Sequence, residues 1–475
     1  MTILSGTACR EAAQTAFDDF LEAYPAYTQT RALDELRFRE FGRLDEQQHV
    51  YLDYTGAALY PRSLARDHIA LLEQFVLGNP HSKNNASLTS TRLVEGVRRD
   101  VLRYFNADPD SHTVIFTANA SAALKLVGES YPFSPGGHLL LTADNHNSVN
   151  GIREFARARG ATITYIPLAS DDLRINAIEP YLATGHASHA RLFAYPAQSN
   201  FSGVRHPLSW IDQAHAHGYD VLLDAAAFVP GQRLDLALIR ADFVAVSFYK
   251  MFGYPTGVGA LIARRDALAR LRRPWFAGGT VRLVSTLADH HVLDEGEAAF
   301  EEGTVNYLNL PAVSAGLIYL EEVGVELIQH RTMLLLAYLL RELRTLRHAN
   351  GRAAARIYGP ADTERRGASV VFNILDRRGA VLPHSLVETQ ANQAKISLRS
   401  GCFCNPGASE FALGHSRAEI QACRLAAGDD DFDMRRYSEC MGDKALGAVR
   451  VSLGMASNFA DAHRFVKFIA DTYLH

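Results

Sequence analysis

The chain has 475 residues, which is longer than one typical domain, and 48% of them are hydrophobic, enough to bury a large core. Its formal net charge is −4 at pH 7 and no basic block stands out, so binding to nucleic acid is not expected. No uncharged apolar run is long enough to span a membrane, and no basic segment followed by an apolar one opens the chain, so neither a membrane protein nor a secreted one is expected.

Short apolar runs and helical patterns alternate along much of the chain. Residues 1–48 carry many charges and predict one or two helices. The stretch from about 49 to 270 has the βαβ signature of a parallel sheet. Its predicted strands include residues 113–117, 139–142, 162–166, 191–195, 221–224 and 257–263. Helices are predicted over 311–346 and 461–473, and a further strand over 368–375.

Lys250 follows an apolar stretch that predicts a buried strand, and Gly253 closes the turn after it. An amine at the end of a buried strand is partly desolvated, which favours the neutral form that a Schiff-base lysine for pyridoxal 5′-phosphate (PLP) needs. Asp224 ends another buried run, and ligands of open α/β sheets gather at such strand ends. Its carboxylate would keep the ring nitrogen of PLP protonated. Taken alone, Lys250 could be an ordinary solvated charge, and Asp224 could cap the turn that follows its strand. The two residues together favour a PLP-binding site.

A phosphate-binding site is predicted where the strand 113–117 passes into a helix over 122–130. Small residues, among them Ala120 and Ser121, come just before this helix and would present N–H groups to an anion. Ser121 could add its hydroxyl, and Ser247, which precedes the lysine, is a second candidate. The alternative is that Ser121 is an ordinary N-cap.

Cys404 lies between glycines and a proline, in the segment Arg399-Ser-Gly-Cys-Phe-Cys-Asn-Pro-Gly407, which predicts an irregular, exposed loop. A thiol beside arginine could react as a thiolate and carry a persulfide. Arg399 is suited to grip a substrate carboxylate in a bidentate fork. The alternatives are a structural pair of thiols, half of a metal site, or a surface arginine. No metal is predicted, because Cys423 and Cys440 do not supply a second close pair of ligands.

These segments resemble the aminotransferase class V family, in its cysteine desulfurase branch. They are most similar to the PLP domain of molybdenum cofactor sulfurases. The resemblance runs in order from about residue 50 to 455, through segments 51–58, 78–82, 196–203, 247–259, 300–306 and 399–407. Segment 51–58 is similar to the opening strand of that family.

The resemblance implies a role for each matching position. It implies that Lys250 forms the covalent link to PLP and that Asp224 pairs with the ring nitrogen. It also implies that Ser121, Ser247 and the adjoining Ala120 bind the phosphate. His146 would stack on the ring, although without the resemblance it would be interpreted as a histidine in a polar turn. The remaining implied roles are the ring hydroxyl and substrate for Asn200, the phosphate of the neighbouring subunit for Thr304, the substrate carboxylate for Arg399 and the persulfide for Cys404.

Two positions depart from many cysteine desulfurases. Tyr249, counted among the cofactor-binding positions, stands where they have a histidine, which agrees with the sulfurase branch. Ala227 stands where they have a polar residue that touches the cofactor.

The implied fold is PLP fold type I, an α/β fold with a mostly parallel seven-stranded sheet in a large domain and a smaller α+β domain built from both chain ends. We predict that residues 49–305 form the large domain, that 306–475 form the small one, joined by 1–48, and that the protein is a homodimer.

The function predicted from this resemblance is that of an L-cysteine desulfurase of the molybdenum cofactor sulfurase type. It would convert L-cysteine to L-alanine and leave a persulfide on Cys404 for an acceptor protein or cofactor. A further C-terminal domain, which many such sulfurases carry, would not fit in this length, so the acceptor stays open. Five cysteines, an odd number, argue against a disulfide framework, and a reducing cytoplasm would suit a working thiol.

Three alternatives remain open from the sequence. A PLP-dependent C–S lyase acting on cysteine, cystine or a related thioether would share the cofactor residues and need no Cys404. A class V transaminase or epimerase would leave the two neighbouring cysteines without a role. A catalytically silent scaffold for a sulfur-transfer partner would have no need of Lys250, Asp224 and a phosphate site together.

Overall fold

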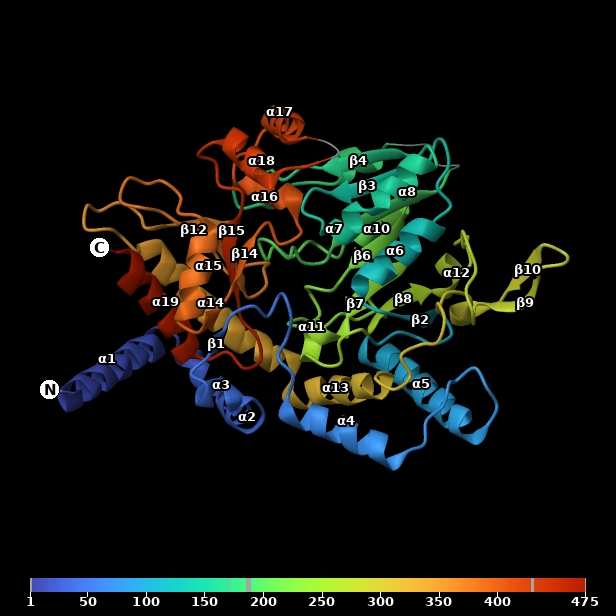
Figure 1. Ribbon diagram of the computed structural model, residues 1–475, viewed down its shortest axis with the longest axis horizontal. Coiled ribbons are helices and arrows are strands. Elements are labelled where there is room, and N and C mark those ends of the chain that lie inside the picture. The colour runs from blue at the N-terminus through green and yellow to red at the C-terminus, as the bar shows by residue number, and fades with distance from the viewer. Residues whose placement is uncertain (1, 170, 185–188, 429–430, 475) are drawn as a thin grey trace.

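Seven strands form the central sheet of the computed structural model, which describes residues 2–169, 171–184, 189–428 and 431–474 (Figure 1). Their order across the sheet is β2 (His112–Thr117), β8 (Gly259–Arg264), β7 (Phe243–Ser247), β6 (Asp220–Asp224), β5 (Arg191–Pro196), β3 (His138–Thr142) and β4 (Thr162–Ile166). The pairs from β7 across to β4 are parallel, while β8 runs antiparallel to both β7 and β2. The prediction of a mostly parallel seven-stranded sheet is confirmed.

Both faces of this sheet are covered, which explains why its strands read as nearly continuous apolar runs. Val114 and Phe116 of β2 pack in one cluster with α5 (Asn85–Tyr104) and α13 (Leu310–Val323). Ile115, which points to the opposite face, packs with α6 (Ala120–Ser130) and α8 (Ile152–Ala158). Alternate residues of a strand therefore enter two different cores, so apolar residues are favoured on both of its faces.

A second, antiparallel sheet contains β11 (Ala355–Tyr358), β12 (Ser369–Ile374), β15 (Ala448–Ser452) and β14 (Arg399–Gly401). A third hydrophobic cluster joins it to α14 (Val325–Thr345), α15 (His384–Gln393), α19 (Phe459–Tyr473) and α1 (Thr2–Ala23). In this cluster the ring of Phe20 lies 4.6 Å from that of Phe459, between centroids, so the two ends of the chain pack together. The boundary between a large and a small domain stays a prediction, and α13 packs against α4 (Arg62–Gln74) and α5.

The remaining elements are short. Before the central sheet lie η1 (Pro25–Thr30), α2 (Ala32–Phe41), α3 (Arg43–Glu46) and β1 (Val50–Tyr51), and later ones are α7 (Asn147–Asn150), α9 (Glu179–Leu182), α10 (Trp210–Ala216), α11 (Phe248–Phe252), α12 (Arg265–Leu268), η2 (Gly296–Ala299) and β13 (Ile396–Ser397). The opening strand expected over 51–58 is shorter than predicted, because only β1 pairs, with β13, and turns follow. The hairpin of β9 (Val281–Ser285) and β10 (His290–Leu293) projects at the opposite end of the molecule from α1 (Figure 1).

The segment between β14 and β15 contains α16 (Pro406–Ala412), α17 (Arg417–Ala427) and α18 (Met434–Met441). A disulfide between Cys423 and Cys440 joins α17 to α18. The odd count of cysteines argued against a disulfide framework, and this single pair was not expected, because only the packing of the two helices brings the distant cysteines together. Cys402 and Cys404 are free and exposed.

Among the described residues no single helix is long and apolar enough to cross a membrane. One bent pair of helices, α13 with α14, is long and apolar enough, but by length and composition only.

Candidate active site

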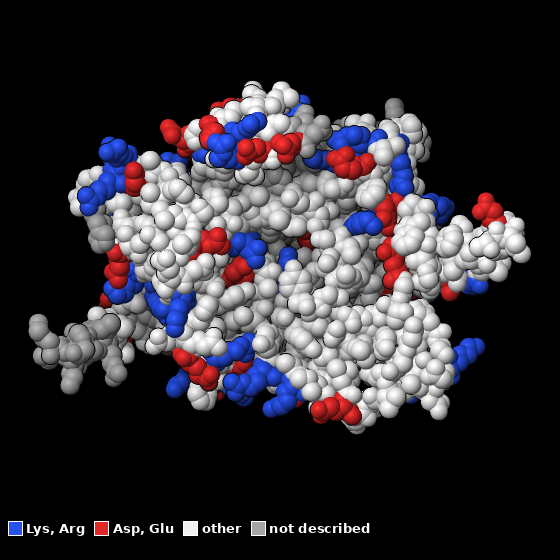
Figure 2. Space-filling view, viewed as in Figure 1, with Lys and Arg blue, Asp and Glu red and all other residues white. Residues whose placement is uncertain are grey.

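One cavity at the carboxyl ends of the parallel strands collects most of the predicted site residues. It has a volume of about 290 Å³, and its walls include Ala120, Ser121, His146, Asn200, Asp224, Ser247, Tyr249 and Lys250. Parallel strands bring their carboxyl ends to one edge of the sheet, and Asp224 at the end of β6 pairs in register with Ala245 of β7, shortly before the lysine. Charged side chains of both signs lie in the hollowed centre of this face (Figure 2).

Lys250 lies in the single-turn helix α11, which directly follows β7. Burial lowers the pKa of its amine, and the guanidinium groups of Arg450 and Arg399 act in the same direction, while the Asp224 carboxylate opposes them. The turn ends at Gly253, whose φ of 80° is left-handed, and a Cβ there would approach the backbone nitrogen of Tyr60 to 2.3 Å. The lysine is thus fixed in place and biased towards its neutral form.

The phosphate cradle is built by the start of α6, where N–H groups and the helix dipole favour an anion. The N-cap is Asn119, whose Oδ1 accepts a hydrogen bond of 3.0 Å from the Ala122 amide, so Ser121 is not the cap and α6 begins two residues earlier than predicted. Ser247 Oγ accepts a bond of 2.8 Å from the Ala120 amide. The hydroxyl of Ser121 lies 2.5 Å from that of Ser148. Both predicted serines therefore lie at the first turn of α6.

His146 precedes α7 on the wall of the same cavity. Its Nδ1 accepts a hydrogen bond of 3.1 Å from the Ser148 amide, which fixes the ring at the start of this helix. Burial lowers the pKa of the imidazole, and Lys250 and Arg450 add to this, while Asp224 opposes it. A neutral ring held in place on a cavity wall can stack on a flat ligand.

The loop that carries Cys404 is tied to the cavity wall. Asn200 Nδ2 donates a hydrogen bond of 2.7 Å to the carbonyl of Phe403, and Asn405 Nδ2 donates one of 2.9 Å to Oδ1 of Asn200. The carbonyl of Cys404 accepts a bond of 2.7 Å from the amide of Asn147. The loop is irregular and its thiols are exposed, as predicted, but these bonds anchor its backbone beside His146.

Phe403 and Cys404 both have a φ of 55°, in the left-handed region that residues other than glycine rarely occupy. Such backbone strain persists only where the surroundings impose it. Here the Phe403 ring is buried 5.4 Å from the Phe201 ring, between centroids, and the Arg450 guanidinium lies over it at 4.8 Å. With Phe403 turned inward as an anchor, the thiols on either side of it are left exposed.

Arg399 does not line the cavity but grips an acid of its own chain. Its Nε and one terminal nitrogen donate to the carboxylate of Asp53 at 2.7–3.1 Å, and its side chain is half exposed. The buried Arg450 donates to the same carboxylate at 3.0 Å and to the backbone carbonyl of Asn200 at 2.6 Å. Two guanidinium groups therefore share one carboxylate near Lys250, and this leaves a net positive charge for the carboxylate of a substrate.

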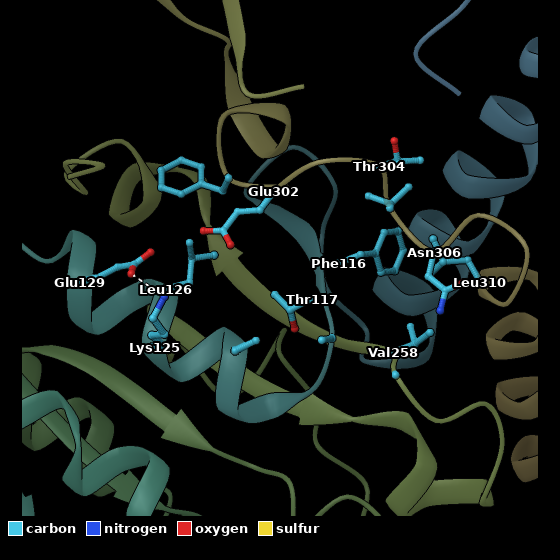
Figure 3. A pocket seen from close by; sticks show the side chains of 15 residues that line it. Phe116, Thr117, Lys125, Leu126, Glu129, Val258, Glu302, Thr304, Asn306 and Leu310 are labelled. Atoms are coloured by element: carbon cyan, nitrogen blue, oxygen red, sulfur yellow. Dashed lines mark ion pairs between the residues drawn. The ribbon is translucent and has the colours of Figure 1, made fainter. Parts of the chain in front are cut away.

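Thr304 lies apart from the Lys250 cavity, in an adjoining cavity of about 280 Å³ that shares Ala118 and Gly257 with it (Figure 3). Its hydroxyl accepts a hydrogen bond of 3.0 Å from Asn79. Its expected contact with the phosphate of a neighbouring subunit stays a prediction.

Arg450, Asp53 and Gln198 were not identified from the sequence as site residues. Arg450 had a usable signal, since an arginine in the middle of the apolar strand β15 is a buried charge in need of a function. Asp53 and Gln198 fall in the segments 51–58 and 196–203 that carry the resemblance, but nothing in those segments shows that Arg399 and Ala227 are their partners. No cluster of three or more histidine, cysteine or acidic side chains suited to a metal occurs in the described parts of the chain.

The cavity offers what PLP requires: a desolvated amine, a carboxylate for the ring nitrogen, a ring to stack on it and a helix N-terminus for the phosphate. The sequence profile of the aminotransferase class V family matches residues 50–465. The chain belongs to this family.

Curated relatives are similar along most of this chain. It is 40% identical over 471 residues to a molybdenum cofactor sulfurase of Bos taurus and 35% identical over 495 residues to one of Solanum lycopersicum. These alignments cover 93% and 96% of this chain, but 52% and 60% of those proteins. The chain thus spans about half the length of the curated relatives it matches.

Solved structures share the fold. A cysteine desulfurase of Thermococcus onnurineus NA1 superposes with a TM-score of 0.76 at 22% identity, covering 92% of this chain and 97% of that one. The cysteine desulfurase CsdA of Escherichia coli gives 0.73 at 21%, covering 92% and 98%. A C-DES variant with glycine covalently linked to its PLP cofactor gives 0.68 at 18%, covering 92% and 99%. The predicted PLP type I fold is confirmed.

Proposed function

We propose that this protein is a PLP-dependent L-cysteine desulfurase of the molybdenum cofactor sulfurase type. The observation that carries the proposal is the anchoring of the Cys404 loop to the cavity wall. The hydrogen bonds of Asn200, Asn405 and Asn147, which follows His146, hold the loop there. An exposed thiol held beside a cofactor cavity suits the transfer of sulfur to the protein. The similarity to molybdenum cofactor sulfurases supports the same conclusion.

In this proposal PLP, once bound, supplies an electron sink that stabilises negative charge at the α-carbon of the substrate. Lys250 holds the cofactor through its amine, and Asp224 keeps the ring nitrogen protonated. His146 stacks on the ring, while the first turn of α6 with Ser121 and Ser247 holds the phosphate. Each of these residues lines the same cavity.

The substrate carboxylate is held by Arg399, with Arg450 behind it, because the pair carries one more positive charge than Asp53 neutralises. With PLP bound, Lys250 would be the base that takes the α-proton of the substrate. Burial lowers the pKa of its amine, which favours the neutral form that a general base needs.

The Cys404 thiolate then attacks the sulfur of the substrate. A sulfur–sulfur bond forms as the carbon–sulfur bond breaks, and the carbon that loses sulfur gains a proton. L-cysteine and a protein thiol thus become L-alanine and a protein persulfide, with all atoms and electrons accounted for. The persulfide passes to a sulfur acceptor, either a protein or a cofactor such as the molybdenum cofactor.

We further propose that the protein is a homodimer, in which Thr304 binds the phosphate of the other subunit's cofactor, and that it is located in the cytoplasm.

A single assay with two products tests the proposal. The purified protein is supplied with PLP and L-cysteine, and alanine is measured together with persulfide trapped by alkylation and located by mass spectrometry. We expect equal amounts of both in one turnover without reductant, with the persulfide on Cys404. A protein that gains no colour with PLP, or gives keto acid in place of alanine, would contradict the proposal. Release of pyruvate and sulfide without a protein persulfide would indicate a C–S lyase.

A further inference from the structure

A buried histidine–aspartate pair, His206 with Asp144, has no role in the site described above. His206 Nε2 lies 2.8 Å from Asp144 Oδ2, and each of the two side chains is only 1% exposed. An ionised carboxylate accepts hydrogen bonds but cannot donate them, so Nε2 carries the shared proton. Neither residue lines the Lys250 cavity. Burying two ionisable groups costs free energy that an apolar pair would not, which indicates a role beyond packing.

His206 is held firmly on its own side of the pair. It lies between β5 and α10, and its backbone amide donates a hydrogen bond of 3.0 Å to the carbonyl of Ala197. Its ring stacks on that of Trp210, 5.0 Å away between centroids. The imidazole therefore offers its N–H at one place only, and Asp144 is the residue that this donor positions.

Asp144 depends on the bond from His206. Its other carboxylate oxygen, Oδ1, is buried and has no hydrogen-bond partner in the part of the chain that the structure describes. Without His206, neither oxygen of a buried carboxylate would have a side-chain donor, which is strongly disfavoured. Asp144 would then shift towards water, and its backbone would shift with it.

The backbone of Asp144 holds the loop that carries Cys404. Its carbonyl accepts a hydrogen bond of 2.6 Å from Nδ2 of Asn405, the residue after the cysteine. The two segments are also in direct backbone contact, because a Cβ at Gly407 would collide with the carbonyl of Ala143. A shift of Asp144 is therefore passed on to the loop and its thiol.

We propose that His206 is a positioning residue for sulfur transfer, and that it acts through Asp144 and Asn405 to hold Cys404 beside the Lys250 cavity. The inference rests on the proposed function, in which Cys404 takes the sulfur of L-cysteine. Because the pair does not line the cavity, it affects the binding of PLP and of L-cysteine much less than the transfer step. A small displacement of a nucleophile slows such a step steeply.

The test replaces His206 with phenylalanine, which keeps a flat ring against Trp210 but removes the donor. His206→Gln returns an N–H close to the place of Nε2 and is the conservative rescue. His215→Phe is the matched control, because His215 Nε2 lies 2.7 Å from a carboxylate oxygen of Asp242, just before β7 begins and so at the opposite edge of the sheet. Thermal melting shows which variants are folded. If His206→Phe does not fold, Asp144→Asn takes its place, since it exchanges the charged acceptor for a neutral one.

Two rates are measured in a single turnover of the full chain, loaded with PLP and mixed with L-cysteine. The change in visible absorption reports substrate reaching the cofactor, and alkylation followed by mass spectrometry reports persulfide on Cys404. For His206→Phe we expect persulfide formation to slow about ten- to a hundredfold. The absorption change, the KM for L-cysteine and the affinity for PLP should stay within about threefold of the wild type. His206→Gln should recover most of the rate, and His215→Phe should match the wild type.

Persulfide formation at the wild-type rate in folded His206→Phe, or in Asp144→Asn where that variant replaces it, would overturn the proposal. Slowing of both rates by the same factor would overturn it too, as would a His206→Gln variant as slow as His206→Phe, because each result would reduce His206 to a packing residue. A wild-type protein that forms no persulfide from L-cysteine would instead refute the proposed function on which the inference rests.

Discussion

The side-chain amide of Asn200 donates a hydrogen bond of 2.7 Å to the backbone carbonyl of Phe403, the residue that precedes Cys404. Asn200 lines the Lys250 cavity, so one residue joins the wall of that cavity to the loop of the exposed thiol. The bond is reinforced by Asn405, which donates to the oxygen of the same amide. The position of the thiol is therefore set by the cavity wall.

Replacing Asn200 with alanine should release this loop while Lys250 and Asp224 stay in place. We expect persulfide formation to slow by about ten- to a hundredfold, in line with a partly buried hydrogen bond worth about 1–3 kcal/mol. The colour change on adding L-cysteine should be affected much less. Both are measured in a single turnover, by rapid-mixing absorbance and by quenched alkylation. Asn350→Ala is the matched control, since Asn350 also donates to a backbone carbonyl, at an exposed turn.

Cys404→Ala should still bind PLP and still change colour with L-cysteine, because those steps use only residues of the cavity. It should form no persulfide, and alanine formation should fall sharply, since the nucleophile is gone. Cys402→Ala, two residues away in the same exposed loop, is the control and should be milder. Persulfide found on Cys402 alone would exchange the two roles. Wild-type rates of alanine formation in Cys404→Ala would contradict the role of Cys404, and pyruvate with sulfide in place of alanine would favour the lyase.

The pH dependence of cofactor attachment should follow the neighbours of Lys250. The neutral amine attacks PLP, so the attachment rate should rise with pH, with a midpoint below the ordinary lysine value because burial lowers the pKa. Arg450 lowers this pKa and Asp224 raises it. Arg450→Gln should therefore move the midpoint up and Asp224→Asn should move it down. Stopped-flow absorbance of the apoproteins across pH measures this, and shifts of the same sign in both variants would contradict the assignment.

The disulfide between Cys423 and Cys440 closes a separation of 17 residues around α17 and α18. A loop of that size restricts the unfolded chain by about 3 kcal/mol in the chain-entropy model. Cys440→Ser should therefore destabilise this helical pair, seen as faster hydrogen exchange over residues 417–427 and 434–441 with little change in the central sheet. Ser438→Ala, in the same helix, serves as the control. Unchanged exchange would mean that packing alone holds the two helices.

Much of the fold was predictable because most strands of the central sheet, though not the edge strand β4, are buried on both faces. A continuous apolar run ended by Asp224, or followed by Lys250, can be recognised without knowledge of its neighbours. The start of α6 was misplaced by two residues because Asn119 and Ser121 are both good caps, and the choice depends on the bond that Ser247 makes with Ala120. That bond connects elements far apart in the chain.

The parts of the site that were missed depend on contacts between distant segments. The sequence around Cys404 predicts an exposed loop, but nothing in it shows that Asn200 and Asn147 hold the loop. Arg399 was expected to be free for a substrate, whereas Asp53 occupies part of its fork. Local patterns predict which residues react, and the long-range contacts determine how those residues are oriented.

The bond between Asp53 and Arg450 spans 397 residues of the chain. During synthesis the ribosome makes Asp53 early, and Lys250 next, but Arg450 follows only after roughly tens of seconds at ordinary translation rates. Over that interval the lysine, the aspartate and the start of α6 can fold, while the wall behind Asn200 still lacks the arginine that braces it. A nascent chain is therefore expected to form the residues that hold the cofactor before Arg450 completes the wall behind Asn200 and joins Arg399 at Asp53.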